Sequence, residues 1–202
     1  DRGEVTMGYS IDSMQSDCYP GTTVLVNRLD LRTQGELDAV EAAIVTAKQA
    51  QWENAPLCDT FDFEHYRTIH RWLFGDLYDW AGEIRKVNIS KKGTRFCPVE
   101  EIPRVSGAIF NRLAEKDLLR GLSRKDFVKE LTDLYQRTNE LHPFREGNGR
   151  TQRLFLMQLA EQAGYTLNFY DMDPDELMIA TIYSAQGIEE PLQQLFERIV
   201  RD

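Results

Sequence analysis

Apolar side chains recur at helical spacing along most of the chain. In the first such segment, residues 34–50, the apolar positions are three or four residues apart and would form one face of a helix: Leu37, Val40, Ile44 and Val45. The same periodicity predicts six more helices, over residues 63–78, 100–113, 125–140, 148–163, 173–183 and 190–200. The pattern therefore predicts a protein that is mainly helical.

Residues that favour helix ends stand at several of these boundaries. Asp62 or Thr60 can cap the second helix and Ser123 can cap the fourth, because their side-chain oxygens accept hydrogen bonds from free N–H groups. Gly164 follows the fifth helix, at a position where the left-handed backbone that ends many helices favours glycine.

One segment, residues 84–97, follows a different pattern. Ile84, Val87 and Ile89 alternate with polar residues, and the chain then turns at Lys92–Gly93. Such alternation around a turn predicts a short β-hairpin, and the lysines at its tip predict that it is exposed. We therefore expect an all-α fold with one short hairpin.

Composition narrows the class of protein. The 202 residues suit one domain, and the formal net charge of -9 argues against a general nucleic-acid binder, which needs a basic face. The three cysteines are scattered, as is typical of a reducing cytosol. No apolar run reaches the roughly 18 residues of a membrane span, and the N-terminus does not resemble a signal peptide. We expect a cytoplasmic protein without membrane or direct nucleic-acid partners, and the missing initiator Met predicts a trimmed chain or an excised domain.

The segment HPFREGNGRTQR, residues 142–153, joins two predicted helices and carries unusual charge. Arg150 and Arg153 share a face in the first turn of the second helix, where each cation opposes the helix dipole by about 0.3–1 kcal/mol unless an anion lies beside it. Gly147 and Gly149 permit backbone conformations that turn successive N–H groups toward an anion. These features predict a site for several phosphate oxygens.

Two further residues extend this prediction. Glu146 would repel phosphates unless a divalent cation such as Mg²⁺ lay between them. His142 has a near-neutral pKa that suits it to accept a proton. The alternative is an ordinary Gly-Asn-Gly turn whose arginines pair with acidic residues of this acidic chain. Six compatible residues within twelve positions favour the phosphate site.

The same segment resembles the signature of the Fic family, His-Pro-Phe-x-(Asp/Glu)-Gly-Asn-Gly-Arg-x-x-Arg. Every defined position matches: His142, Pro143, Phe144, Glu146, Gly147, Asn148, Gly149, Arg150 and Arg153. The similarity extends to HRWLFGDLYDWAGEIR, to YPGTTVLVNRL and to VNISKKGTRFCP, which resembles the family's hairpin flap. It implies a single Fic domain over residues 1–202, with a motif core at about 60–165, a flap at about 85–98 and an N-terminal segment at 1–30.

Fic enzymes transfer AMP from ATP to a hydroxyl of a target protein and release pyrophosphate. By this resemblance His142 would be the general base toward a Tyr, Thr or Ser hydroxyl, and Glu146 would hold Mg²⁺ on the α- and β-phosphates. The phosphates would bind in an anion hole formed by Gly147, Asn148 and Gly149. Two arginines, Arg150 and Arg153, would also bind them. Pro143 and Phe144 would be structural anchors of the loop.

The resemblance also implies that the flap docks the target. Strand addition along the hairpin would clamp the target's backbone and align its hydroxyl, the alternative being a plain exposed hairpin. The residues concerned are Val87, Asn88, Ile89, Ser90, Lys91, Lys92, Gly93, Thr94, Arg95 and Phe96. A relative in the family that phosphorylates its target has Lys in place of Gly149, so this glycine favours nucleotidyl transfer.

Family members are often inhibited by a helix with the pattern Ser/Thr-x-x-x-Glu-Gly/Asn, whose Glu pairs with the second arginine of the signature. In this chain Thr60–Glu64 has the spacing, but His65 follows instead of Gly or Asn. This implies a separate, small, antitoxin-like inhibitor that reaches Arg153, and a toxin-like enzyme in the bacterial cytoplasm. The alternative is a translocated effector that acts in the cytosol of a host.

Two other interpretations of the signature stay open. A catalytically idle nucleotide-binding or protein-docking module would keep the loop, although phosphate binding alone does not require His142 and Glu146. A Fic domain that uses UTP or GTP would share the chemistry.

The remaining histidines do not suggest a metal site. His65 and His70 are five positions apart, about 140° round a helix, so they do not share a face. His70 lies among Ile69, Trp72 and Leu73, and we expect it to be a satisfied, partly buried structural residue.

Overall fold

The computed structural model describes residues 10–11 and 17–202. Its helices are α1 (Gln34–Asn54), α2 (Phe63–Phe74), α3 (Ile102–Glu115), α4 (Arg124–Leu141), α5 (Asn148–Gln162), α6 (Pro174–Ala185) and α7 (Glu190–Ile199). Short 3₁₀ turns lie at η1 (Val99–Glu101), η2 (Asp117–Leu119) and η3 (Phe169–Asp171). All the predicted helices are present, which confirms the mainly helical fold. Among the described residues, no helix is both long enough and apolar enough to cross a membrane.

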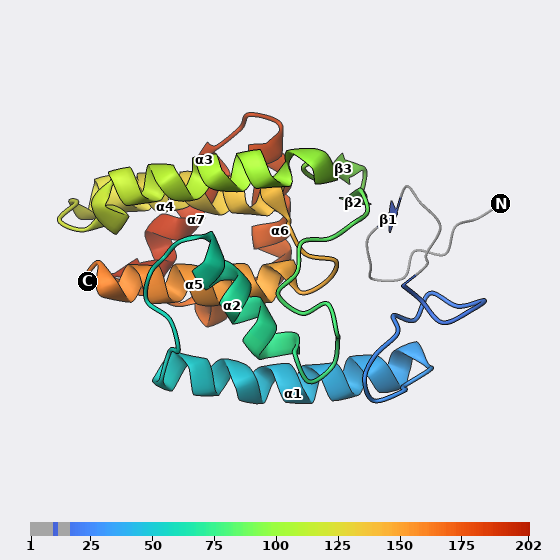
Figure 1. Ribbon diagram of the computed structural model, residues 1–202. Coiled ribbons are helices and arrows are strands. Elements are labelled where there is room, and N and C mark those ends of the chain that lie inside the picture. Colours follow the sequence, from blue (N-terminus) through green and yellow to red (C-terminus); the bar gives the residue numbers. More distant parts are fainter. Residues whose placement is uncertain (1–9, 12–16) are drawn as a thin grey trace.

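Helix α5 forms the centre of the fold. It contacts α1, α2 and α4, and its residues Phe155, Leu156 and Leu159 are completely buried. In Figure 1, α4 runs on one side of α5 and α1 on the other. Burying each such side chain stabilises the fold by about 1.5–3 kcal/mol, so α5 is firmly held. The motif begins just before α5, and its loop therefore sits on a rigid support.

Helix α1 runs further than predicted, to Asn54 rather than Ala50. The cause is Trp52, which is buried and donates its indole N–H to Gln158 on α5 at 3.1 Å.

Helix α2 ends earlier than predicted, at Phe74 rather than at residue 78. The N–H groups of Leu77 and Tyr78 both donate to the Phe74 carbonyl, at 3.0 and 2.9 Å, which turns the chain back on itself. The ring of Tyr78 then stacks on Trp80 with centroids 4.4 Å apart. The apolar residues beyond Phe74 therefore pack from a tight turn and not from a helix.

The predicted caps have the expected geometry. The side chain of Asp62, rather than Thr60, accepts the N–H of His65 at 2.8 Å. Ser123 accepts the N–H of Asp126 at 3.2 Å. Gly164 adopts a φ of +90° just after α5, which allows the chain to leave the helix.

The predicted hairpin consists of β2 (Ile89–Lys91) and β3 (Thr94–Arg95), which are antiparallel with Lys91 opposite Thr94. Its turn residues, Lys92 and Gly93, both have positive φ, as two-residue hairpin turns require. Strand β1 (Ser10–Ile11) pairs with the other edge of β2. A second small sheet, which the sequence did not predict, joins β4 (Thr166–Leu167) to β5 (Val200–Arg201). Figure 1 shows the hairpin at one end of the helices and the C-terminus at the other.

Candidate active site

The motif loop between α4 and α5 is held by its own side chains. His142 ends α4 in a left-handed conformation, with φ 42° and ψ 61°, and its N–H donates to Thr138 at 3.1 Å. The side chain of Asn148 accepts the N–H of Phe144 at 2.9 Å and donates to its carbonyl at 2.7 Å. Both ends of the Asn148 amide are thus used to close the loop. This residue can still offer a ligand its backbone N–H and the second hydrogen of its side-chain NH₂.

Behind the loop lies a sealed side, formed by His70, Phe74, Phe144 and Gly147, all of them buried. His70 accepts the N–H of Gly82 at Nδ1, at 2.8 Å, so its proton is on Nε2, which donates to the Glu146 carbonyl at 2.8 Å. Burial lowers the pKa of His70 to about 3. The prediction of a structural histidine is confirmed, and the residue is completely buried rather than partly.

Gly147 of the motif is required by a close neighbour, whereas the neighbour of Gly149 is the flexible end of a side chain. Gly147 has a φ of +79°, and a Cβ there would lie 2.3 Å from the ring of Phe74. A Cβ on Gly149 would lie 3.0 Å from Nη1 of Arg153, whose side chain folds over the start of α5. The anchors Pro143 and Phe144 are both buried, as expected.

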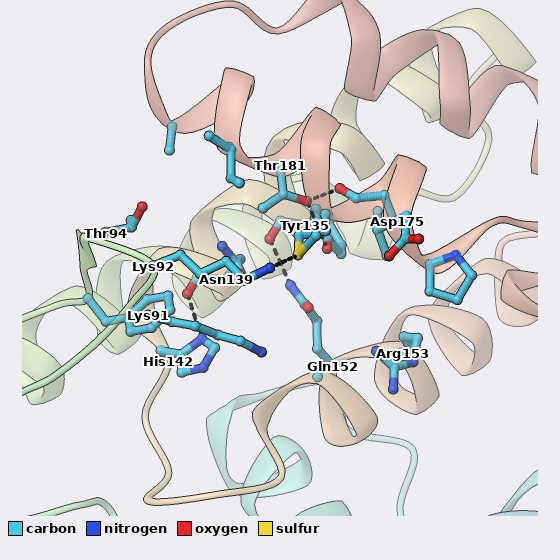
Figure 2. Close-up of a pocket in the computed structure, with 17 residues that line it drawn as sticks. Lys91, Lys92, Thr94, Tyr135, Asn139, His142, Gln152, Arg153, Asp175 and Thr181 are labelled. Atoms are coloured by element: carbon cyan, nitrogen blue, oxygen red, sulfur yellow. Dashed lines mark hydrogen bonds between the residues drawn. The ribbon is translucent and has the colours of Figure 1, made fainter. Parts of the chain in front are cut away.

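In front of the loop lies the open side, a cavity of about 360 Å³. Four groups of residues form its walls (Figure 2), and one of them is Tyr135 and Asn139 of α4. The motif supplies His142, Gly149 and Arg153, and the flap supplies Lys91, Lys92, Thr94 and Phe96. Helix α6 supplies the opposite wall, with Leu177, Met178, Thr181 and Ile182.

The orientation of the His142 ring is fixed within this cavity wall. Its Nδ1 lies 2.9 Å from the carbonyl of Asn139, so Nδ1 carries the proton and Nε2 carries the lone pair. Phe96 of the flap stacks on the ring, with centroids 3.6 Å apart and planes 9° from parallel. Burial, and then the charges of Arg85 and Lys91, lower the pKa of His142 to about 3. The imidazole is therefore neutral at pH 7.

The flap reaches across the cavity to α6. The amine of Lys92 contacts the sulfur of Met178 at 2.8 Å, as Figure 2 shows. Asn88 accepts the N–H of Val99 at 2.9 Å and so holds the base of the hairpin. Ile89 is buried, while the remaining predicted flap residues are at least partly exposed.

The two arginines of the motif point to different neighbours. Arg153 lines the cavity, but Arg150 pairs with Glu41 of α1 at 2.6 Å and lies over the ring of Phe74 at 4.8 Å. This corrects the expectation that both guanidinium groups share one face. The reason is Glu41, which lies far away in the sequence and attracts Arg150 toward the sealed side.

Glu146 suits a cation. Its carboxylate is partly buried and accepts the N–H of Gly147 at 3.1 Å, while Arg150 lies 3.9 Å away. Burial, and then the charge of Glu41, raise the pKa of Glu146, and a nearby cation would offset both effects. Among the described residues, no group of three or more His, Cys, Asp or Glu side chains is arranged so that it could hold a metal ion by itself. A single carboxylate fits Mg²⁺ that also binds substrate phosphates and water.

Several residues of the site were not predicted from the sequence. Asn139 lies one helical turn before His142, and this spacing could have revealed it. Glu41, Arg85 and the wall of α6 gave no signal, because they reach the motif only through tertiary contacts. Glu64, in the segment compared with the inhibitory pattern, pairs with arginines of its own helix α2.

Comparison with known proteins places these features in a family. A profile of the Fic/DOC family matches residues 60–160. A probable protein adenylyltransferase of Sinorhizobium fredii is 40% identical over 184 residues, which cover 91% of this chain and 94% of the relative. The N-terminal Fic domain of a VirB-translocated effector of Bartonella sp. AR 15-3 has a TM-score of 0.86 and 30% identity, covering 91% of this chain and 90% of that one. A second such effector, from Bartonella tribocorum with bound AMPPNP, has a TM-score of 0.84 and 27% identity over 93% and 97% of the two chains. On this evidence, the chain belongs to the Fic/DOC family.

Proposed function

We propose that this chain is a protein adenylyltransferase, which transfers AMP from ATP to a Tyr, Thr or Ser hydroxyl of a target protein and releases pyrophosphate. The observation that carries the proposal is a neutral imidazole, His142, in the wall of a cavity that also holds the guanidinium of Arg153 and the flap. The name of the Sinorhizobium relative and the ATP analogue in the Bartonella tribocorum structure support it.

His142 acts as the general base. The proton on Nδ1 is held by Asn139, so Nε2 is the nitrogen that takes the proton of the acceptor hydroxyl. The low pKa of the ring would make it a weak base, but a triphosphate bound beside it favours the charged imidazolium and raises this pKa. Such a base is worth about 10²–10⁴ in rate.

The phosphates lie at the start of α5. The N–H groups of Asn148 and Gly149 and the guanidinium of Arg153 supply donors there, which suits several phosphate oxygens. Arg150 joins them only by leaving Glu41, so Arg153 makes the larger contribution.

Glu146 is the residue that would hold Mg²⁺. When bound, the ion neutralises phosphate charge and so eases the departure of pyrophosphate. The carboxylate of Glu146 is fixed for this role by the N–H of Gly147.

The flap holds the target beside His142. Strand β2 pairs with β1 on one edge and β3 on the other, so the outer edge of β3, at Thr94–Arg95, is where a target strand would add. A separate antitoxin-like protein would inhibit the enzyme by placing a carboxylate on Arg153. We place the enzyme in the bacterial cytoplasm, or in host cytosol if it is a translocated effector.

The test compares two radiolabelled forms of ATP. The chain is incubated with a bacterial lysate, Mg²⁺ and either α-³²P-ATP or γ-³²P-ATP, and EDTA provides the control. We expect protein labelling from the α-label, none from the γ-label, and loss of labelling with EDTA. Labelling from the γ-label alone would indicate phosphoryl transfer, and labelling from neither would leave a nucleotide-binding module. Mass spectrometry of the labelled bands then identifies the modified side chain.

A further inference from the structure

Arg85 lies between the flap and the motif loop and is buried, with 3% of its surface exposed. Its guanidinium donates to four backbone carbonyls, and these are His142 at 2.7 Å, Val87 at 2.9 Å, Cys97 at 2.5 Å and Leu141 at 3.4 Å. The backbone N–H of Arg85 also donates to the Pro143 carbonyl at 2.9 Å. One side chain thus bonds to three separate stretches of backbone.

These stretches belong to the flap and to the motif loop, which hold the two reacting groups of the proposed reaction. Val87 precedes β2 and Cys97 follows β3, so Arg85 holds both arms of the flap. The His142 and Leu141 carbonyls belong to the start of the motif loop, which carries the base. Because a guanidinium is planar and its donors have fixed directions, it sets the position of one stretch relative to the other.

A second set of contacts also depends on the position of the flap relative to the motif loop. Phe96, next to Cys97, stacks on the His142 ring, and the N–H of Cys97 donates to the Glu140 carbonyl at 2.9 Å. Any shift of the flap relative to the loop therefore changes the stacking of Phe96 on His142.

We propose that Arg85 is a positioning residue, which sets the distance between the flap that holds the acceptor hydroxyl and the imidazole that takes its proton. The inference rests on the proposed function. Misplacing reacting groups by about 1 Å can cost 10²-fold in rate. Loss of the Arg85 hydrogen bonds between the flap and the motif loop should therefore slow transfer to the target. Nucleotide binding depends on Arg153 and the start of α5. None of the hydrogen bonds of Arg85 described above reaches these residues.

The first experiment uses Arg85→Lys, which keeps the charge and the stem but replaces the planar fork with a single ammonium. Arg104→Lys is the matched control, because Arg104 has a side chain that is 72% exposed. We expect Arg85→Lys to label lysate proteins from α-³²P-ATP about 10²-fold more slowly, with its dissociation constant for AMPPNP changed by less than about twofold. Labelling at the wild-type rate, or a matching loss of AMPPNP affinity, would overturn the inference. If the wild-type protein itself does not label, the proposed function is wrong instead.

The second experiment reads the geometry without using activity. We expect the NMR signals of the His142 ring, assigned with His142→Ala, to be shifted upfield by the stacked Phe96 and to take their unstacked positions in Phe96→Leu. We expect Arg85→Lys to move these signals toward the Phe96→Leu positions and to leave the His70 signals in place. Signals that stay at the wild-type positions would overturn the inference.

A third measurement decides the matter if Arg85→Lys does not fold. In the wild-type protein, the Nε–H of Arg85 donates to His142 in the interior, whereas that of Arg104 bonds to Glu101 at the surface. We expect hydrogen exchange at Arg85 Nε to be much slower than at Arg104 Nε. Similar exchange rates would show that the bridge does not persist in solution and would refute the proposal.

Discussion

Two buried histidines lie on opposite sides of the motif loop, and only one of them faces a cavity. Each stacks on a phenylalanine, His70 on Phe144 at 3.9 Å and His142 on Phe96 at 3.6 Å. Burial lowers the pKa of both to about 3. Yet both nitrogens of His70 bond to interior backbone groups, while the ring of His142 lines the open side. A perturbed pKa therefore does not identify a catalytic base unless the ring also faces a cavity.

The contrast between the two histidines would be wrong if transfer did not depend on His142. We expect His142→Ala to lower the rate of labelling from α-³²P-ATP by about 10²–10⁴-fold while AMPPNP still binds, because the lost group is a base and not a phosphate ligand. Calorimetry measures the binding and autoradiography the rate. An unchanged rate would remove His142 from the mechanism and leave the cavity as a binding site.

Two glycines with the same backbone angle sharpen the contrast between the sealed and the open side. Gly147 and Gly93 both have a φ of +79°, but only Gly147 has a neighbour in the way, the ring of Phe74 at 2.3 Å. Left-handed strain alone costs about 1–2 kcal/mol, which we expect for Gly93→Ala. Overpacking adds about 1–3 kcal/mol for Gly147→Ala. Urea unfolding measures both, and equal losses would mean that the sealed side yields as easily as the flap.

The contrast between the sealed and the open side also predicts that variants of the two motif arginines differ in nucleotide affinity. Arg153 lines the cavity and Arg150 pairs with Glu41. Charge-assisted hydrogen bonds are worth about 1.5–3 kcal/mol, so we expect Arg153→Gln to weaken AMPPNP binding by roughly 10–100-fold. Arg150→Gln should have the smaller effect, because Arg150 must first give up Glu41. The reverse order in calorimetry would show that the nucleotide draws Arg150 away from Glu41.

The remaining prediction concerns stability at acid pH. The pKa of His70 is about 3 in the fold and near 6.5 in the unfolded chain, so between these values the unfolded state binds more protons. Its contribution to the free energy of unfolding is complete above pH 6.5 and declines as pH falls toward 3, by roughly 2 kcal/mol at pH 5. We expect the loss of stability from pH 7.5 to pH 5, measured in urea, to be smaller by about that amount in His70→Gln. An unchanged pH dependence would mean that His70 is protonated in the fold.

The sequence predicted the helices, the flap and the residues of the loop, because periodicity and a contiguous motif record them directly. It did not predict that α6 forms a wall of the cavity, since Met178 meets the flap only after the chain has folded. The role of Arg85 was also hidden, because its acceptors are backbone carbonyls that any residue can supply. The separation of Arg150 from Arg153 depended on Glu41, more than a hundred residues away.

The left-handed backbone at His142 has a consequence for selection experiments. A φ of 42° is cheap for glycine, whereas any residue with a side chain held there costs stability. Libraries screened only for heat resistance should thus enrich Gly at position 142 and discard the histidine. If a histidine persists at this position through such a screen, something other than thermal stability must favour it.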